Sequence, residues 1–143
     1  MSAALGQLPG VLGVGTDLVD VERLRRALER HPGLRERLFT ASEWDYAARH
    51  RDPHPHLAAR FAAKEAVMKA LGHGMSSMGF AEIEVVRAES GAPAISLDAA
   101  AAAVAAAAGV SQWHLSLTHT DALAQAVAIA VGPGAPTCPG VTP

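Results

Sequence analysis

One carboxylate stands inside an apolar segment near the amino terminus. Asp17 falls within the run from Val14 to Val19, where an ionised side chain is costly to bury unless it is capped, paired or bound to a metal. The plainer explanation is a cap for the helix that follows, because aspartate is a preferred N-cap residue. The alternative is a ligand for a cation, and this residue alone leaves both explanations open.

A second group of charges falls between residues 60 and 72. Arg60 and Lys64 are four residues apart on a predicted helix, a like-charge spacing that is mildly destabilising. An anion held between the two cations would offset that repulsion. Glu65 and Lys69 have the same spacing with opposite charges, which predicts an ion pair on the neighbouring face of the helix. Spacing alone, however, favours an ordinary charged helix surface.

A third group lies at the end of a predicted strand. Strand parity puts His119 on the same face as the apolar side chains of the segment 112–118. A histidine there is either a satisfied core residue or a site residue, and taken alone the core residue is favoured. Glycines at 72 and 74 leave room for backbone N–H groups to approach a phosphate, which is a weak signal by itself.

Hydrophobic periodicity and turn residues predict the elements that must position these groups. The order is one strand, three helices, two strands, a helix and two strands, which predicts an α+β fold with helices packed on a mainly antiparallel sheet. The predicted strands are at 10–19, 81–88, 94–97, 112–118 and 122–131. The first predicted helix runs from about 20 to Pro32, the second begins at the capping box Thr40–Glu43, the third ends at Ala70 or Leu71, and the fourth runs from Asp98 to Gly109.

Composition limits the kind of protein. A length of 143 residues is that of a single domain, and a net charge of −2 gives no basic field for nucleic acid or an anionic membrane. The alanine run 99–108 is too short to span a bilayer, and one cysteine, Cys138, predicts a reducing compartment. We expect a cytoplasmic protein with a loose leader over 1–9, a domain over 10–132 and a disordered, Pro/Gly-rich tail over 133–143.

Taken together, the three groups resemble one enzyme family. Gly15-Thr16-Asp17, followed by Arg23, is similar to the first motif of the holo-(acyl-carrier-protein) synthases, the small single-domain branch of the 4′-phosphopantetheinyl transferases. The run from Arg60 to Gly72 is similar to the second motif, and the segment from Trp113 to Thr120 to the third. The three occur in the family's order over residues 11–132.

The resemblance implies a 4′-phosphopantetheinyl transferase-like fold and a reaction. In that reaction 4′-phosphopantetheine passes from coenzyme A to a serine of apo acyl carrier protein, in support of fatty acid biosynthesis, and leaves adenosine 3′,5′-bisphosphate. It also implies that Asp17 and Glu65 bind Mg²⁺, an ion that prefers such oxygen donors. The serine belongs to the carrier, so this chain needs only a base, for which Glu65 is our first candidate and Asp121 the second.

Further positions match family residues that contact the two substrates. Besides the two carboxylates, the expected catalytic residues are Lys69 and His119. The residues expected to contact coenzyme A are Arg60, Lys64, Lys69, Gly72, Gly74, Ser116 and His119. Arg23, with Arg26 in the same arginine-rich helix, is expected to meet the acidic carrier protein.

The small branch forms trimers with sites between subunits, so the resemblance also implies a homotrimer. The last predicted strand is apolar on both faces, and its alanines at 124, 126, 128 and 130 suit a close approach between subunits. Two rival interpretations are an inactive relative that only binds carrier protein and another Mg²⁺-dependent phosphoryl-transfer enzyme. Intact Asp17, Glu65 and Lys69 argue against the first, and the lack of P-loop or kinase motifs argues against the common forms of the second.

Overall fold

The computed structural model describes residues 10–72 and 78–133. The expected leader, nearly all of the expected tail and Gly74 lie outside these ranges. The elements are β1 (Val11–Asp20), α1 (Val21–Arg30), α2 (Leu34–Leu38), α3 (Ala41–Ala48), α4 (His54–Ala70), a 3₁₀ turn (Phe80–Glu82), β2 (Ile83–Arg87), β3 (Pro93–Leu97), α5 (Ala99–Ala107), β4 (Gln112–His119) and β5 (Leu123–Val131). Only α2 and the 3₁₀ turn were not predicted, because such short segments show no helical repeat.

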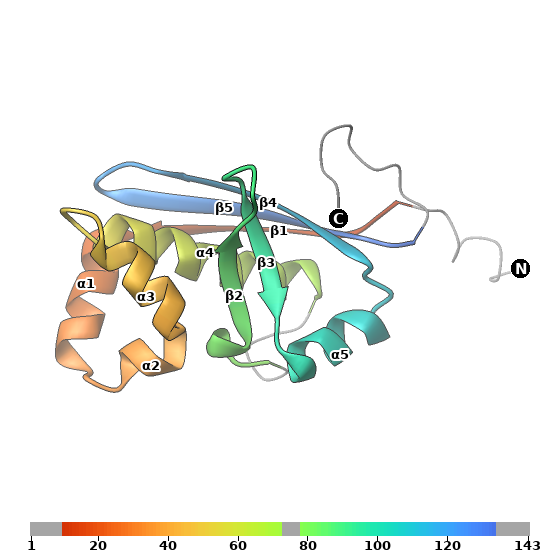
Figure 1. Cartoon of the computed structure of the whole chain (residues 1–143), viewed down its shortest axis with the longest axis horizontal. Helices are drawn as coiled ribbons and strands as arrows, with labels where there is room; N and C mark the ends of the chain where they lie inside the picture. Colours follow the sequence, from red (N-terminus) through yellow and green to blue (C-terminus); the bar gives the residue numbers. More distant parts are fainter. Residues whose placement is uncertain (1–9, 73–77, 134–143) are drawn as a thin grey trace, which may run out of the picture.

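The strands form two antiparallel units. β1, β5 and β4 make a three-stranded sheet with β5 in the centre, and β2 pairs with β3 in a separate hairpin. α4 runs along one face of the larger sheet, while α1, α2 and α3 gather at one end and the hairpin lies beside α4 (Figure 1). This arrangement confirms the predicted α+β class, with helices packed on antiparallel strands.

Small residues allow α4 to lie very close to the sheet. A Cβ atom built on Gly13 or Gly15 of β1 would come within 1.9 or 1.8 Å of the carbonyl oxygen of Ala70 or Ala66. Alanines from both sides are buried at this contact, namely Ala62, Ala63, Ala124, Ala126 and Ala128. β1 is therefore held against the second half of α4. Within the described ranges no helix, α4 included, is both long and apolar enough to cross a bilayer.

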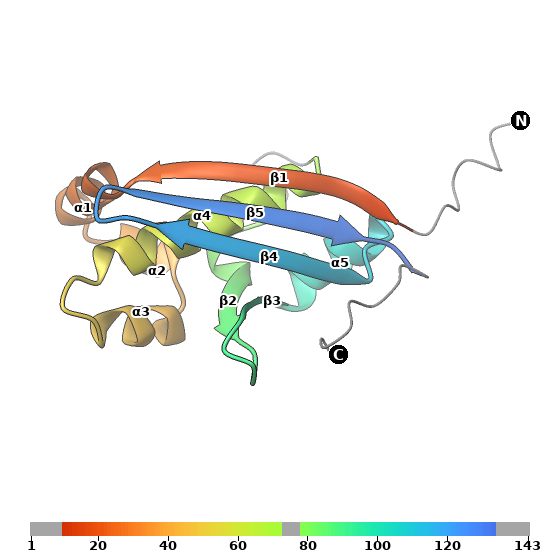
Figure 2. The ribbon, with the colours of Figure 1, turned by 90° about the horizontal axis from the view of Figure 1, so that it is seen from above.

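β5 presents its alanine face to the core of its own chain. Ala124, Ala126, Ala128 and Ala130 are all buried there, so the prediction that this face meets another subunit is wrong. The opposite face of the sheet carries Val14, Leu18 and Leu123, whose side chains are 61%, 62% and 43% exposed. Figure 2 looks onto the sheet, and none of the described helices or strands covers this outer face.

Capping contacts fix where two of the helices begin. Thr40 and Glu43 form the predicted capping box at the start of α3. At α1 the cap is Asp20, whose Oδ1 atom accepts a hydrogen bond from Arg23 N at 2.9 Å. Asp17 lies inside β1, three residues earlier, so the capping explanation for its carboxylate is wrong.

Candidate active site

Three of the predicted site residues come together beside the second half of α4. Asp17 lies on the side of β1 that faces α4, and Glu65 and Lys69 lie one turn apart on that helix. All three line a groove of about 520 Å³ next to α1. The remaining wall is mostly apolar and includes Leu24, Leu34, Leu38, Phe61 and Phe80.

The charges in this groove are arranged around Asp17. Lys69 Nζ lies 3.0 Å from Asp17 Oδ1 and donates a second hydrogen bond, also 3.0 Å long, to the carbonyl oxygen of Thr16. Lys69 therefore pairs with Asp17, whereas helical spacing predicted a pair with Glu65. Burial raises the pKa of Glu65, and the negative charge of Asp17 raises it further. A cation between the two side chains would stabilise the ionised form of Glu65, which burial and the charge of Asp17 disfavour.

The donor set suits a hard cation that keeps part of its coordination shell for other ligands. Within the described residues, no group of three or more histidine, cysteine, aspartate or glutamate side chains is placed to hold a metal ion. Mg²⁺ often binds to one or two carboxylates and completes its shell with water and substrate phosphates. Asp17 and Glu65 fit that pattern better than they fit zinc, which takes nitrogen and sulfur ligands.

Arg60 and His119 lie in a different pocket. It has a volume of about 210 Å³, is also lined by Tyr46, His56 and Arg87, and shares no lining residue with the first groove. Arg60 is only 5% exposed, and its Cζ atom lies 4.0 Å from the centre of the Tyr46 ring. Sequence reasoning missed Tyr46, His56 and Arg87, because they come from three different elements and no motif connects them.

Aromatic rings stack beside this second pocket. His50 and His56 lie 3.6 Å apart between ring centres, and His56 meets His119 edge-on at 5.0 Å. Burial lowers the pKa of His56 to about 4, and the nearby positive groups of His50, His119, Arg60 and Arg87 contribute. His56 is therefore neutral near pH 7, and Arg60 and Arg87 give the pocket positive charge. His119 is exposed at the end of β4, which excludes the core-histidine interpretation.

Lys64 faces neither groove. Its side chain is fully buried, and Nζ lies 2.6 Å from both Glu43 Oε2 and the carbonyl oxygen of Leu38. The other carboxylate oxygen of Glu43 accepts a hydrogen bond from Val85 N at 2.8 Å. The anion beside Lys64 is thus a glutamate of the same chain, and the structure contradicts the expected contact of Lys64 with a phosphate of coenzyme A.

Ser116 and Gly72 also lie apart from both grooves. Ser116 pairs with Val127 on the exposed outer face of the sheet, whereas His119 lies on the opposite face, so the two cannot share a pocket within one chain. Gly72 follows α4 with φ of +69° and ends that helix as a left-handed glycine. Helix termination alone explains a glycine at this position, so no contact with a phosphate is needed to account for it.

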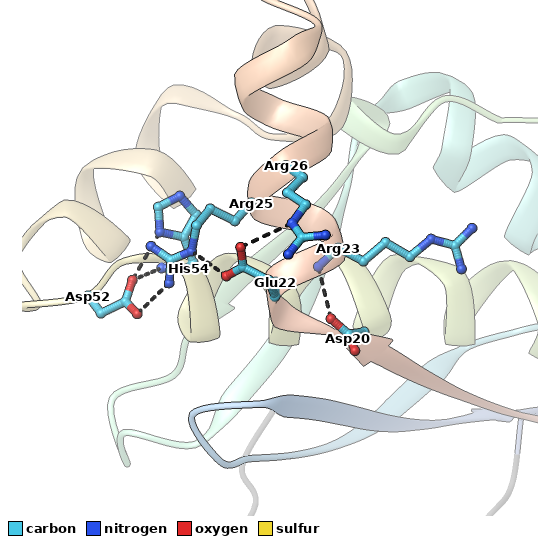
Figure 3. Close-up of polar contacts among 7 residues, drawn as sticks. All are labelled: Asp20, Glu22, Arg23, Arg25, Arg26, Asp52 and His54. Atoms are coloured by element: carbon cyan, nitrogen blue, oxygen red, sulfur yellow. Dashed lines mark hydrogen bonds and ion pairs between the residues drawn. The ribbon is translucent and has the colours of Figure 1, made fainter.

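The arginines of α1 differ in their partners (Figure 3). Arg25 Nη2 lies 2.8 Å from Asp52 Oδ2, while Arg25 Nε and Arg26 Nε lie 3.1 and 3.3 Å from the carboxylate of Glu22. The side chain of Arg23 extends away from these groups and makes no ion pair with any described residue. It lines the groove that contains the two carboxylates, where it adds a positive charge.

Comparison with known proteins identifies the family. Residues 13–131 match the model of the 4′-phosphopantetheinyl transferase superfamily. The holo-(acyl-carrier-protein) synthase of Beutenbergia cavernae is 48% identical over 108 residues, which are 76% of this chain and 87% of that relative. The solved synthase of Neisseria meningitidis is 29% identical with a TM-score of 0.77 and covers 84% of this chain and 98% of its own. The synthase of Helicobacter pylori, solved in complex with coenzyme A, is 26% identical with a TM-score of 0.72 and covers 83% and 99%. The match extends over nearly all of the described residues, and this chain belongs to the 4′-phosphopantetheinyl transferase superfamily.

Proposed function

We propose that this chain transfers 4′-phosphopantetheine from coenzyme A to a serine of an apo acyl carrier protein. The products are holo carrier protein, for use in fatty acid biosynthesis, and adenosine 3′,5′-bisphosphate. The observation that carries the proposal is the placement of Asp17 and Glu65 in one groove, with Lys69 3.0 Å from Asp17. In a member of this family, two carboxylates and a lysine on one wall are the groups that a pyrophosphate and its cation require.

The residues of the groove have separate tasks in this reaction. Asp17 and Glu65 would hold Mg²⁺, which when bound offsets the charge of the pyrophosphate and of the leaving bisphosphate. Lys69 adds a positive charge that is fixed in place by Asp17 and the Thr16 carbonyl. As the carrier's serine oxygen bonds to the β-phosphorus of the pyrophosphate, a base must take the hydroxyl proton. Glu65, whose pKa burial raises, is the candidate base, and Asp121, exposed in the turn before β5, is the alternative.

The donor is coenzyme A in this proposal, since the relative from H. pylori was solved in complex with it. Arg60 and His119, which share the second pocket, are the candidates for contact with its nucleotide end. We place the reaction in the cytoplasm, in keeping with a sequence that carries a single cysteine.

The carrier protein would dock over α1 and the apolar wall of the first groove. Arg23 provides a positive charge without an ion pair among the described residues, while Arg26 is partly offset by Glu22. Beside Arg23 the groove wall carries the apolar side chains of Leu24, Leu34, Phe61 and Phe80. A charge next to an apolar surface suits a partner that presents both an acidic group and apolar side chains.

We further propose a homotrimer whose sites lie between subunits. The exposed sheet face carries the large apolar side chains of Val14, Leu18 and Leu123, and exposed apolar side chains gathered on one face are typical of an interface. Arg60 and Glu65 point to opposite sides of α4, because they are five residues apart on a helix with about 3.6 residues per turn. A coenzyme that contacts the second pocket of one copy would therefore reach the carboxylates of a neighbour.

Mass spectrometry of an apo carrier protein tests the proposed activity directly. After incubation with the full chain, Mg²⁺ and coenzyme A, the carrier should gain the mass of one phosphopantetheine, and omission of Mg²⁺ should prevent the gain. The same mixture with the carrier's acceptor serine changed to alanine is the control. A carrier that binds to the chain without any gain in mass would favour the alternative of a non-catalytic binding module.

A further inference from the structure

Apolar contacts hold the first half of α1 more firmly than the second. Val21 and Leu24, both near the start of the helix, are its buried residues, and Leu28 is only partly buried against the core. The rest of the helix carries charged side chains that are exposed or half-buried. Polar contacts can therefore decide how the second half of α1 lies on the domain.

One ion pair joins α1 to another element. Arg25 Nη2 donates a hydrogen bond of 2.8 Å to Oδ2 of Asp52, which lies in the loop between α3 and α4. The other ion pairs of α1, from Arg25 and Arg26 to Glu22, stay within the helix. Among the described residues, no further ion pair links α1 to a different element.

Asp52 is itself fixed at the start of α4. Its Oδ1 atom accepts a hydrogen bond of 3.0 Å from the backbone N–H of His54, and His54 Nδ1 lies 3.0 Å from the same oxygen. These contacts with His54, together with the Arg25 guanidinium, lower the pKa of Asp52 to about 2, so its carboxylate is ionised near pH 7. One carboxylate thus connects α1 with the helix that carries Glu65.

The anchor lies on the back of α1 relative to the groove. Arg23, Leu24 and Ala27 line the groove, whereas Arg25 is two residues from Arg23 and so points to the other side of the helix. Figure 3 shows the side chains of Arg23 and Arg25 extending in different directions, with Asp52 beside Arg25. A contact on the back of a helix fixes its rotation, and this rotation decides how Arg23 and Ala27 face the groove.

We propose that Asp52 is a positioning residue, which through Arg25 holds α1 in the orientation that the carrier protein binds. This inference rests on the proposed function, since it takes α1 as the docking surface. The pair is half exposed, and such pairs add little to folding stability. Its effect should fall on docking, because a helix that is already oriented avoids the cost of ordering when the partner binds.

The sign of one effect separates positioning from simple charge. Asp52→Asn keeps the size of the side chain and an acceptor for His54 N, but it removes the charge that pairs with Arg25. If charge alone mattered, the loss of a negative group would lower the KM for an acidic carrier. Positioning predicts the opposite, a KM about threefold to fivefold higher, with unchanged kcat and KM for coenzyme A. The thermal unfolding midpoint should hardly change.

A double-mutant cycle assigns the effect to the pair. Arg25→Met should also raise the KM for the carrier, and adding Asp52→Asn to it should raise the KM no further, because both changes break the same contact. Arg25→Lys keeps a cation that can meet Asp52 and should stay within about twofold of the wild type. Asp45→Asn is the matched control, since it removes the same charge from an exposed position on α3 and should match the wild type.

Hydrogen exchange tests the anchor without transfer. In the full chain, Asp52→Asn should speed exchange of the backbone amides of residues 25–30 about threefold and leave those of β5 unchanged. A chain that transfers nothing but shows this pattern would refute the proposed reaction and support the anchor. An Asp52→Asn chain whose KM for the carrier falls or stays constant, or whose α1 exchanges like that of Asp45→Asn, would overturn the positioning role.

Discussion

At the scale of single residues, Asp17 and Glu65 are proposed to bind the cation together, so each should be essential for transfer. Asp17→Asn and Glu65→Gln keep the size of the side chain but remove the charge that a cation and Lys69 require. We expect each to lower the rate of transfer by about a hundredfold or more, with an unchanged thermal unfolding midpoint. Asp45→Asn, a change of the same kind at an exposed position on α3, should retain full activity. Near-wild-type transfer by either groove variant, with Mg²⁺ as the only divalent metal, would show that the metal site is misassigned.

Arg23 and Arg26 should contribute unequally to docking of the carrier. Arg26 Nε already lies 3.3 Å from Glu22, whereas Arg23 has no ion pair among the described residues. Reversal of Arg23 to Glu should therefore raise the KM for the carrier more than reversal of Arg26, and added salt should reduce both effects. The KM for coenzyme A should not change, and Arg49→Glu, directly after α3, serves as the control. If the two reversals were equal to this control, the docking surface would have to lie elsewhere.

His56 links folding stability to pH. Its pKa in the folded protein is about 4 and lies below that of a histidine in an unfolded chain, about 6.5, mainly because it is buried. The unfolded chain therefore binds more protons between these values, so this contribution to stability is complete above about pH 6.5 and is lost as the pH falls toward 4. Urea unfolding at pH 7.5 and at pH 5 should show the decline. His56→Phe keeps a ring that can stack but takes up no proton, and an equally steep decline in that variant would assign the effect to other groups.

Single-residue chemistry could be predicted where a residue was unusual for its surroundings. Asp17 in an apolar strand is such a case, and the structure brings it together with Glu65 and Lys69. The spacing of Arg60 and Lys64 could not predict the partner of Lys64, because the anion beside it is Glu43, 21 residues earlier in the chain. A pair formed between two elements depends on how they pack, and helical periodicity contains no information on that.

At the scale of elements, the ion pair of Lys64 and Glu43 joins α4 to the start of α3, and Glu43 in turn holds β2 through Val85 N. Lys64→Met would leave the Glu43 carboxylate buried without its cation, which should lower the free energy of unfolding by about 3–5 kcal/mol. Urea unfolding of this variant measures the loss. Adding Glu43→Met should recover part of it, since the double variant leaves no buried charge. A loss below about 1 kcal/mol in the single variant would show that the pair does not hold these elements together.

The elements themselves were easier to predict than the way they pack. Nine strands and helices, including the helix capped by Asp98, follow from periodicity and capping residues, and the structure has them close to the predicted bounds. The orientation of β5 could not be obtained in this way, because that strand is apolar on both faces. Gly13 and Gly15 on β1 leave space for α4 directly against the sheet, and that contact decides that the alanine face turns inward.

For the whole molecule, the proposed assembly would explain both the exposed sheet face and the separation of the two grooves. If the outer face around Val14 packs against other copies, the groove with Asp17 and the pocket with His119 can meet across a subunit boundary, although they share no residue within one chain. This assembly remains a proposal. The proposed assembly would also place Ser116, which lies on the outer face and away from His119, at the boundary between copies.

Mixing inactive variants tests whether sites are shared between copies. Asp17→Ala and His119→Ala should each be inactive alone, but after reversible dissociation and reassembly some interfaces would combine an intact groove from one copy with an intact pocket from another. Partial recovery of transfer is therefore expected. The control mixture carries Val14→Glu in both chains, which places a charge on the outer sheet face, should yield monomers by light scattering and should recover nothing. Mixtures that demonstrably exchange subunits yet stay inactive, or a wild type that is monomeric at working concentration, would refute sharing, because each copy would then have to supply a complete site of its own.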